Sequence, residues 1–158
     1  FIGSPSMNKL EHSKLSSKDG HTYITFGNET ENATVQLPDS LGLKPEVQAY
    51  IGKEVIMGIR PENIHDEDVF VQTASSAVIN AKVEVTELMG SETYLYLSTS
   101  GKDENIIARV NPRTTSIAGA EIKVAFDVNH LHFFDKETAR TILVSDAVPA
   151  PTKTNLTK

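Results

Sequence analysis

Short β-type runs separated by turn residues constrain the fold of this chain more than any other feature of its sequence. Runs with β-branched residues or strict alternation predict strands at 21–26, 33–37, 54–59, 76–87, 93–98, 105–110, 121–128 and 141–144. Turn-forming residues such as Asp19-Gly20 separate these runs. Only 44–51 and 114–118 have a helical pattern, and both segments are short. We therefore expect an all-β fold, a barrel or a sandwich, with minor helical segments.

Two stretches that lie 67 residues apart resemble each other. GKEVIMGIRPENIH begins at Gly52 and GAEIKVAFDVNHLH begins at Gly119, and their apolar residues match in position. Upstream, TVQLP (34–38) matches ARVNP (108–112), and the dipeptide Thr-Tyr opens a strand in each half. This order indicates two copies of one β unit, each too small to bury a good core alone. We therefore expect an internal duplication that forms two small OB-type β-barrels, which share or exchange strands.

Composition excludes several classes of function. The net charge of −6 disfavours a nucleic-acid partner, and acidic residues surround Tyr23, Tyr94 and Tyr96, which could otherwise stack with bases. The chain has no cysteine, which excludes a disulfide framework, thiol catalysis and a cysteine-based zinc site. The motifs Gly-x4-Gly-Lys-Ser/Thr and His-Glu-x-x-His are absent. We therefore predict no catalytic residue, no metal site and no cofactor for this chain.

Arg60-Pro61-Glu62 is the sharpest local feature of the sequence. Proline fixes its own φ and pushes the preceding residue toward extended backbone, so the strand before it must end or bulge. Two interpretations stay open. The charged pair could form a structural ion pair or cap, or it could contact a partner surface.

The stretch VEVTELMGSETYLYL (83–97) predicts a hairpin. Alternation places Val83, Val85 and Glu87 on one face, and Gly90 permits the tight turn. Glu87 and Glu92 flank this turn, where no pocket is expected. We therefore predict a structural or interaction role for the two carboxylates in place of acid–base catalysis.

His130 and His132 would share one face if the strand near them continued, and this spacing can hold a metal ion. No third ligand stands nearby in the sequence, and two phenylalanines follow as packing residues. A packed strand end is therefore the simpler interpretation of the pair.

Several segments together resemble a known family. FIGSPSMN, GIRPENI, VEVTELMGSETYLYL, ARVNPR and HLHFFDKETARTI occur in the order seen in MalK-like and MsmK-like sugar ABC transporter ATPase subunits. The resemblance covers 1–143, and in that family these segments form the C-terminal regulatory domain, whose OB-type barrels include the MOP/TOBE-like module. It implies a linker from an absent ATPase domain at 1–12, a first OB-type unit at 13–75 and a second (TOBE) unit at 76–146. The small, Pro-rich and polar composition of 147–158 predicts a disordered tail.

The resemblance also implies a function. The full-length subunit would hydrolyse ATP, with ATP and Mg bound in the missing ATPase domain. It would energise sugar import through membrane subunits, at the cytoplasmic face of the cell membrane. Its regulatory domain would form a homodimer, contact its own ATPase domain and receive a regulatory protein. The positions carried over as interface or regulatory residues are Arg60, Pro61, Glu62, Glu87, Gly90 and Glu92.

A second function stays open from the same resemblance. Related modules of oxyanion importers bind anions such as molybdate at subunit interfaces, so a small-ligand module for an oxyanion or a sugar is the alternative. An anion site needs Ser/Thr, Lys/Arg and backbone N–H groups that converge. Lys82, Ser91 and Thr93 are the candidates for such a site.

Overall fold

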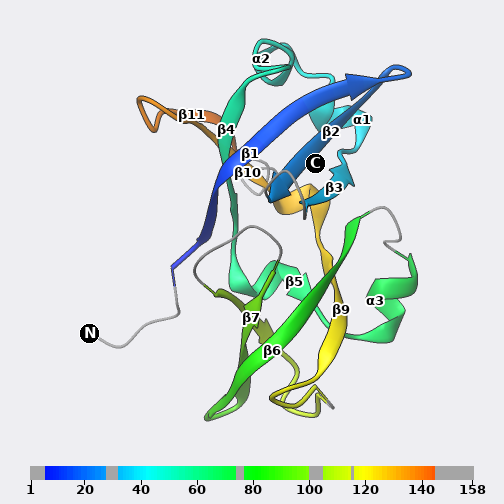
Figure 1. The fold of residues 1–158 in the computed structure, drawn as a ribbon, viewed down its shortest axis with the longest axis vertical. Coiled ribbons are helices and arrows are strands. Elements are labelled where there is room, and N and C mark those ends of the chain that lie inside the picture. Colours follow the sequence, from blue (N-terminus) through cyan, green and yellow to red (C-terminus); the bar gives the residue numbers. More distant parts are fainter. Residues whose placement is uncertain (1–5, 28–31, 74–76, 100–104, 115, 145–158) are drawn as a thin grey trace, which may run out of the picture.

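The computed structural model describes residues 6–27, 32–73, 77–99, 105–114 and 116–144, which form two barrel-like sheets (Figure 1). The strands of the upper sheet are β1 (Asn8–Lys18), β2 (His21–Gly27), β3 (Asn32–Gln36), β4 (Glu54–Ile59), β10 (His132–Asp135) and β11 (Thr141–Val144). Those of the lower sheet are β5 (Ile64–His65), β6 (Val78–Met89), β7 (Glu92–Ser98), β8 (Ile106–Val110) and β9 (Glu121–Phe126). The predicted all-β fold is confirmed.

The two sheets repeat one arrangement of strands. The order β4-β1-β2-β3 in the first sheet corresponds to β9-β6-β7-β8 in the second. Gly52 and Gly119, which precede β4 and β9, have φ angles of +86° and +92°, a region that glycine enters without strain. The Gly52 N–H donates to the Leu15 carbonyl at 2.8 Å, and the Gly119 N–H donates to the Val83 carbonyl at 2.7 Å. These equivalent positions confirm the internal duplication.

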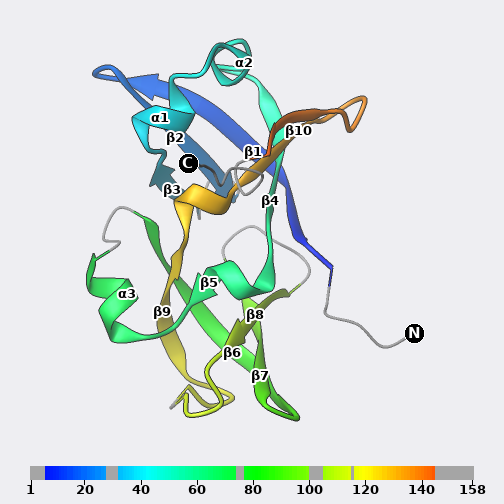
Figure 2. The same cartoon turned by 180° about the vertical axis from the view of Figure 1, so that it is seen from behind.

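Each unit gives its next strand to the opposite sheet. After β4, the one-turn 3₁₀ helix η1 (Pro61–Asn63) leads into β5, which pairs with β9. After β9, the one-turn 3₁₀ helix η3 (Val128–His130) leads into β10, which pairs with β4. Figure 2 shows these two segments passing each other between the upper and lower sheets. The barrels are therefore joined by exchanged strands.

The exchange means that the sheets do not follow the sequence ranges expected for the two units. Residues 13–75 supply β5 to the second sheet, and residues 76–146 supply β10 and β11 to the first. The expected boundary at 75/76 and the expected tail at 147–158 lie outside the described residues. Strand β1 starts at Asn8, within the range 1–12 expected to be a linker.

Strand β1 is a strand that the sequence pattern does not predict. Its only large apolar residues are Leu10 and Leu15, five positions apart, so a period of two would place them on opposite faces. The pairing with β4 shifts register between Leu10 and Ser13, and the Ser13 hydroxyl donates to the Leu10 carbonyl there. This bulge turns both leucines into the core, where they are buried.

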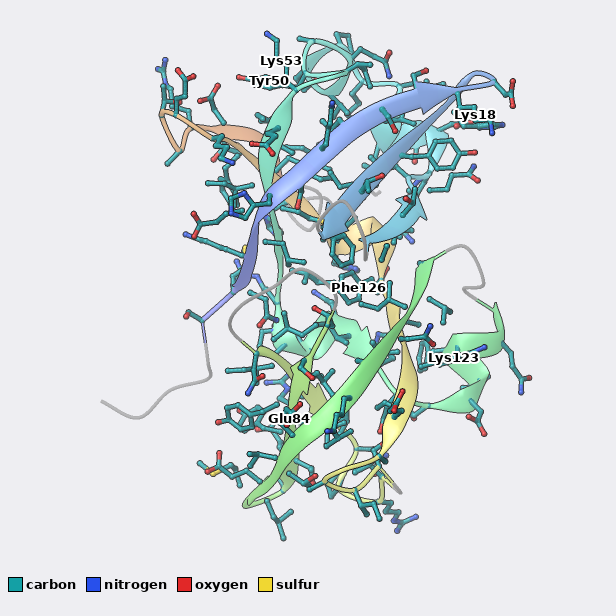
Figure 3. The ribbon with its side chains drawn as sticks, in the orientation of Figure 1. Lys18, Tyr50, Lys53, Glu84, Lys123 and Phe126 are labelled. Carbon is teal, nitrogen blue, oxygen red and sulfur yellow. The ribbon has the colours of Figure 1, made fainter. Side chains whose placement is uncertain are left out.

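Both barrels share one hydrophobic core. Phe26 of β2 stacks on Phe126 of β9, with ring centroids 5.9 Å apart, and Figure 3 shows Phe126 between the two sheets. The buried Asn8 amide joins the sheets a second time, since Nδ2 donates to the carbonyls of Ile59 (3.1 Å) and Ile107 (2.9 Å). Its Oδ1 accepts from the Ile107 N–H at 2.8 Å. A shared core gives the two small units more buried area than either has alone.

Helices are short and peripheral. They are α1 (Asp39–Gly42), α2 (Pro45–Gln48) and α3 (Asp68–Thr73). Helix α2 lies within the predicted helical segment 44–51, whereas α3 was not predicted. The helix expected at 114–118 is wrong for the described residues of that segment, which form turns and irregular backbone between β8 and β9.

Candidate interaction surface

The Arg60-Pro61-Glu62 segment is the first crossover between the barrels. Strand β4 ends at Ile59, Arg60 is extended (φ −78°, ψ 150°), and Pro61 opens η1 at a position where its missing N–H costs nothing. Pro61 is buried, Glu62 is half-buried and Arg60 is exposed. The proline therefore ends the strand and redirects the chain into the second sheet. A contact of Arg60 or Glu62 with a partner stays a prediction.

The second crossover uses different chemistry at equivalent positions. Asp127 takes the place of Arg60, and its Oδ1 accepts from the Asn129 N–H at 3.1 Å. Its Oδ2 lies 2.9 Å from Nδ1 of His130. An aspartate cap therefore fixes η3, where proline fixes η1.

The two crossovers also contact each other directly. The Asp127 N–H donates to the carbonyl of Asn63 at 2.9 Å, so the end of η1 and the start of η3 are tied through the backbone. Sequence patterns gave no signal for this contact, because it joins residues that neither alternation nor spacing relates.

The β6–β7 hairpin holds the predicted residues Glu87, Gly90 and Glu92 at the end of the molecule farthest from the first barrel (Figure 1). Gly90 has φ +64°, as the tight turn requires. Glu92 pairs with Nε of Arg109 at 2.8 Å, and Glu87 accepts from the Tyr96 hydroxyl at 3.1 Å. Burial and the bond to Glu87 raise the pKa of Tyr96. The hairpin carboxylates are therefore engaged within the chain.

Three exposed apolar side chains form what we call the apolar tip: Val85 (50% exposed), Leu88 (69%) and Met89 (44%). The predicted common face of Val83 and Val85 is wrong, because the pairing with β7 shifts register between them. This bulge leaves Val83 buried and turns Val85 to solvent. The pair Leu88-Met89 beside the turn glycine was the one sequence signal for the tip.

The two histidines do not share a strand face. His130 lies in η3 and is bonded to Asp127, whereas His132 is buried in β10, with its ring stacked 6.4 Å from that of Phe134. Among the described residues, no group of three or more His, Asp or Glu side chains is placed to hold a metal ion.

The residues considered for an oxyanion site are not brought together. Lys82 pairs with Ser98 on β7, five residues from Thr93, which corresponds to roughly 17 Å along the strand. Thr93 is buried, whereas Lys82 and Ser91 are exposed.

The tyrosines considered for base stacking are also separated. Tyr23 lies in β2 of the first sheet, and Tyr94 and Tyr96 lie in β7 of the second. Tyr94 is buried as well, so these rings do not form a continuous exposed platform for bases.

Two family models match this arrangement of barrels. The MalK OB fold domain matches residues 3–64, and the TOBE domain matches residues 57–134. Both models include the first crossover and η1. The chain belongs to the family of MalK-like OB/TOBE regulatory domains.

Curated relatives of this OB/TOBE domain are ATP-binding subunits of sugar importers. The oligosaccharides import ATP-binding protein MsmX of Bacillus subtilis is 44% identical over 87% of this chain and 35% of its own length. The multiple sugar-binding transport ATP-binding protein MsmK of Streptococcus mutans is 37% identical over 90% and 35%. The trehalose/maltose import ATP-binding protein MalK of Thermococcus litoralis is 35% identical over 90% and 36%. The chain thus spans about a third of the length of these relatives.

Among solved structures, the OB/TOBE domain is similar to the cytoplasmic molybdate-binding protein ModG with molybdate bound. The TM-score is 0.55 at 12% identity, over 84% of this chain and 96% of that chain. At this identity the likeness shows the fold alone.

None of the helices in the described part of the chain has the length and apolar character that a membrane span requires.

Proposed function

We propose that this domain is the regulatory and dimerisation part of the ATP-binding subunit of a carbohydrate ABC importer, and that it has no catalytic site of its own. The apolar tip of the β6–β7 hairpin is the observation that carries the proposal. By the pairing register, Val85 and Met89 lie on one face of β6 and Leu88 on the other, so both faces of the hairpin end expose an apolar side chain, and exposed apolar surface of this kind marks interaction sites. The sugar-importer relatives support the biological setting.

The surroundings of the tip favour an apolar contact over a charged one. The carboxylates of Glu84, Glu87 and Glu92 are held by Ser98, Tyr96 and Arg109 of the same domain. Arg109 balances the charge of Glu92, whereas Glu84 and Glu87 are bonded only to hydroxyls and keep their charge. The contact through Val85, Leu88 and Met89 is therefore apolar with an acidic rim.

A second copy of the domain is the occupant we propose for the tip. The resemblance to sugar-importer subunits implies pairing through this domain. Each copy has a net charge of −6, so two copies repel at long range and added salt should strengthen their association. A basic partner would show the opposite salt dependence.

The rest of the proposed function concerns the whole subunit. ATP and Mg would bind in an ATPase domain, and membrane subunits would carry the sugar. The subunit would lie at the cytoplasmic face of the membrane. In this setting the paired regulatory domains hold two ATPase domains together during their cycle.

Sedimentation over a concentration series at two salt concentrations tests the dimer. We expect the mean mass of the unmodified chain to rise with concentration, and Leu88→Gln to weaken association about 10- to 100-fold through lost apolar burial. Leu43→Gln is the matched control, because Leu43 is also exposed (49%) but lies beside α1 in the first barrel. A strict monomer at every concentration, or equal effects of the two variants, would contradict the proposal.

A further inference from the structure

A cavity of about 220 Å³ lies between the two barrels, away from the apolar tip. Phe26 and Thr34 line it from the first sheet, and Asn80 and Thr99 line it from the second, with aliphatic side chains around them. Figures 1 and 2 both show β3 next to the upper end of β6, where these residues meet. The cavity therefore touches both halves of the duplication.

One residue of the lining, Thr99, has a buried polar atom without a hydrogen-bond partner in the described part of the chain. The hydroxyl oxygen of Thr99 is buried and has no hydrogen-bond partner among the described residues. A buried hydroxyl that is left unpaired costs free energy, so a ligand that bonds to it regains that cost. The Thr34 hydroxyl is bonded to Thr25 at 3.0 Å on the exposed face of β2 and β3, and Asn80 adds an amide to the lining.

The charge and size of the cavity define its ligand. The seven described residues of the lining include no ionisable side chain, which disfavours an oxyanion, a phosphate or a metal ion. The volume is below the ~300–1,000 Å³ of pockets for drug-sized ligands. Hydroxyl and amide groups beside the Phe26 ring suit a molecule with several hydroxyls and an apolar C–H face.

We propose that this cavity binds a small uncharged polyhydroxyl compound of monosaccharide size. Thr34 and Asn80 are solvent-exposed, so the ligand can reach the cavity from solvent. Phe26 also stacks on Phe126 of the second sheet, so a bound ligand would lie against an aromatic contact that joins the barrels. Binding would thereby bias how the two barrels pack.

Amide chemical-shift changes in the 158-residue chain test this site. The probes are D-glucose and myo-inositol, with the disaccharide maltose as a larger compound and molybdate and sulfate as anions. We expect saturable changes with glucose or inositol at residues on both sides of the cavity, weaker changes with maltose and none with the anions. No changes up to the solubility of glucose and inositol, or changes with the anions alone, would overturn the proposal.

Thr99→Val separates binding from folding. Valine matches the shape of threonine and removes the unpaired hydroxyl, so the variant should be as stable as the unmodified chain or more stable. We expect its affinity for the bound probe to fall about fivefold, the equivalent of one hydrogen bond. Thr86→Val removes an exposed hydroxyl of β6 outside the cavity and should bind normally. Equal affinity of both variants would contradict a role for Thr99. Neither result bears on the proposed dimer.

Discussion

The two crossovers follow the same backbone path, but different side chains fix that path. After β4, a buried proline ends the strand and opens η1. After β9, which lies at the equivalent position of the second unit, an aspartate caps η3 and contacts a histidine. The rigid ring of Pro61 redirects the chain at the first crossover, and the hydrogen bond of Asp127 does so at the second. In both cases the next strand enters the neighbouring sheet. Duplicated units can keep a topology while exchanging the interactions that maintain it.

Substitutions of the residues just before the crossovers should change the free energy of unfolding the most. Phe126 stacks on Phe26 across the barrels, whereas its counterpart Ile59 is a buried aliphatic residue. Phe126→Ala should lower the free energy of unfolding by about 3–5 kcal/mol, and Ile59→Val by about 0.5–1.5 kcal/mol. Urea denaturation measures both values. Similar small losses in the two variants would mean that the aromatic contact does not join the barrels.

Removing the Asp127 cap should have an intermediate effect on stability. Asp127→Ala removes the acceptor for the Asn129 N–H and should cost about 1 kcal/mol, while Asp127→Asn, which can still cap, should retain most of the stability. Arg60→Ala at the first crossover should cost about 0.5 kcal/mol or less, because the side chain is exposed and proline shapes the turn. Thermal unfolding of the three variants checks the order. An Arg60→Ala loss as large as that of Asp127→Ala would reverse the comparison.

The smallest effect concerns the hairpin that follows only the second crossover. The backbone N–H of Thr138 and the hydroxyl of Tyr50 lower the pKa of Asp135 from 3.8 to about 2. A lowered folded-state pKa adds stability above pH 3.8, and this stability is lost as the pH falls toward 2. Asp135→Asn should therefore flatten the decline of the urea midpoint over that range.

The control for this pH experiment is Asp19→Asn, which removes a carboxylate from the exposed β1–β2 turn. Asparagine tolerates the positive φ of 54° at this position. This variant should keep the decline of the unmodified chain. A decline that is unchanged in Asp135→Asn would show that the bonds to Thr138 and Tyr50 do not stabilise the β10–β11 turn.

The repeat was predictable because strands with a buried face keep their apolar pattern, as the matched segments at Gly52 and Gly119 do. The exchange of β5 and β10 was expected only in general terms. Strand β1 and the exposure of Val85 were missed for one physical reason, a bulge. One extra residue reverses the face of every residue beyond it, and alternation counted along the sequence cannot register that reversal.

The sequence predicted where the candidate interaction surface lies but not which side chains it exposes. Gly90 marked the hairpin, yet the neighbouring carboxylates turned out to be bonded within the chain, and the exposed surface belongs to Leu88 and Met89. The cavity between the barrels had no sequence signal. Its lining comes from strands of both sheets that only the tertiary fold brings together.

The exchange of strands also determines when the first barrel can form during synthesis. When the ribosome has released β4, the strand that covers its open edge does not yet exist, because β10 begins at His132, after the whole second unit. An uncovered strand edge is a template for pairing with another chain. The edge of β4 therefore stays unpaired while residues 60–131 are synthesised, and it is covered only when β10 pairs with it.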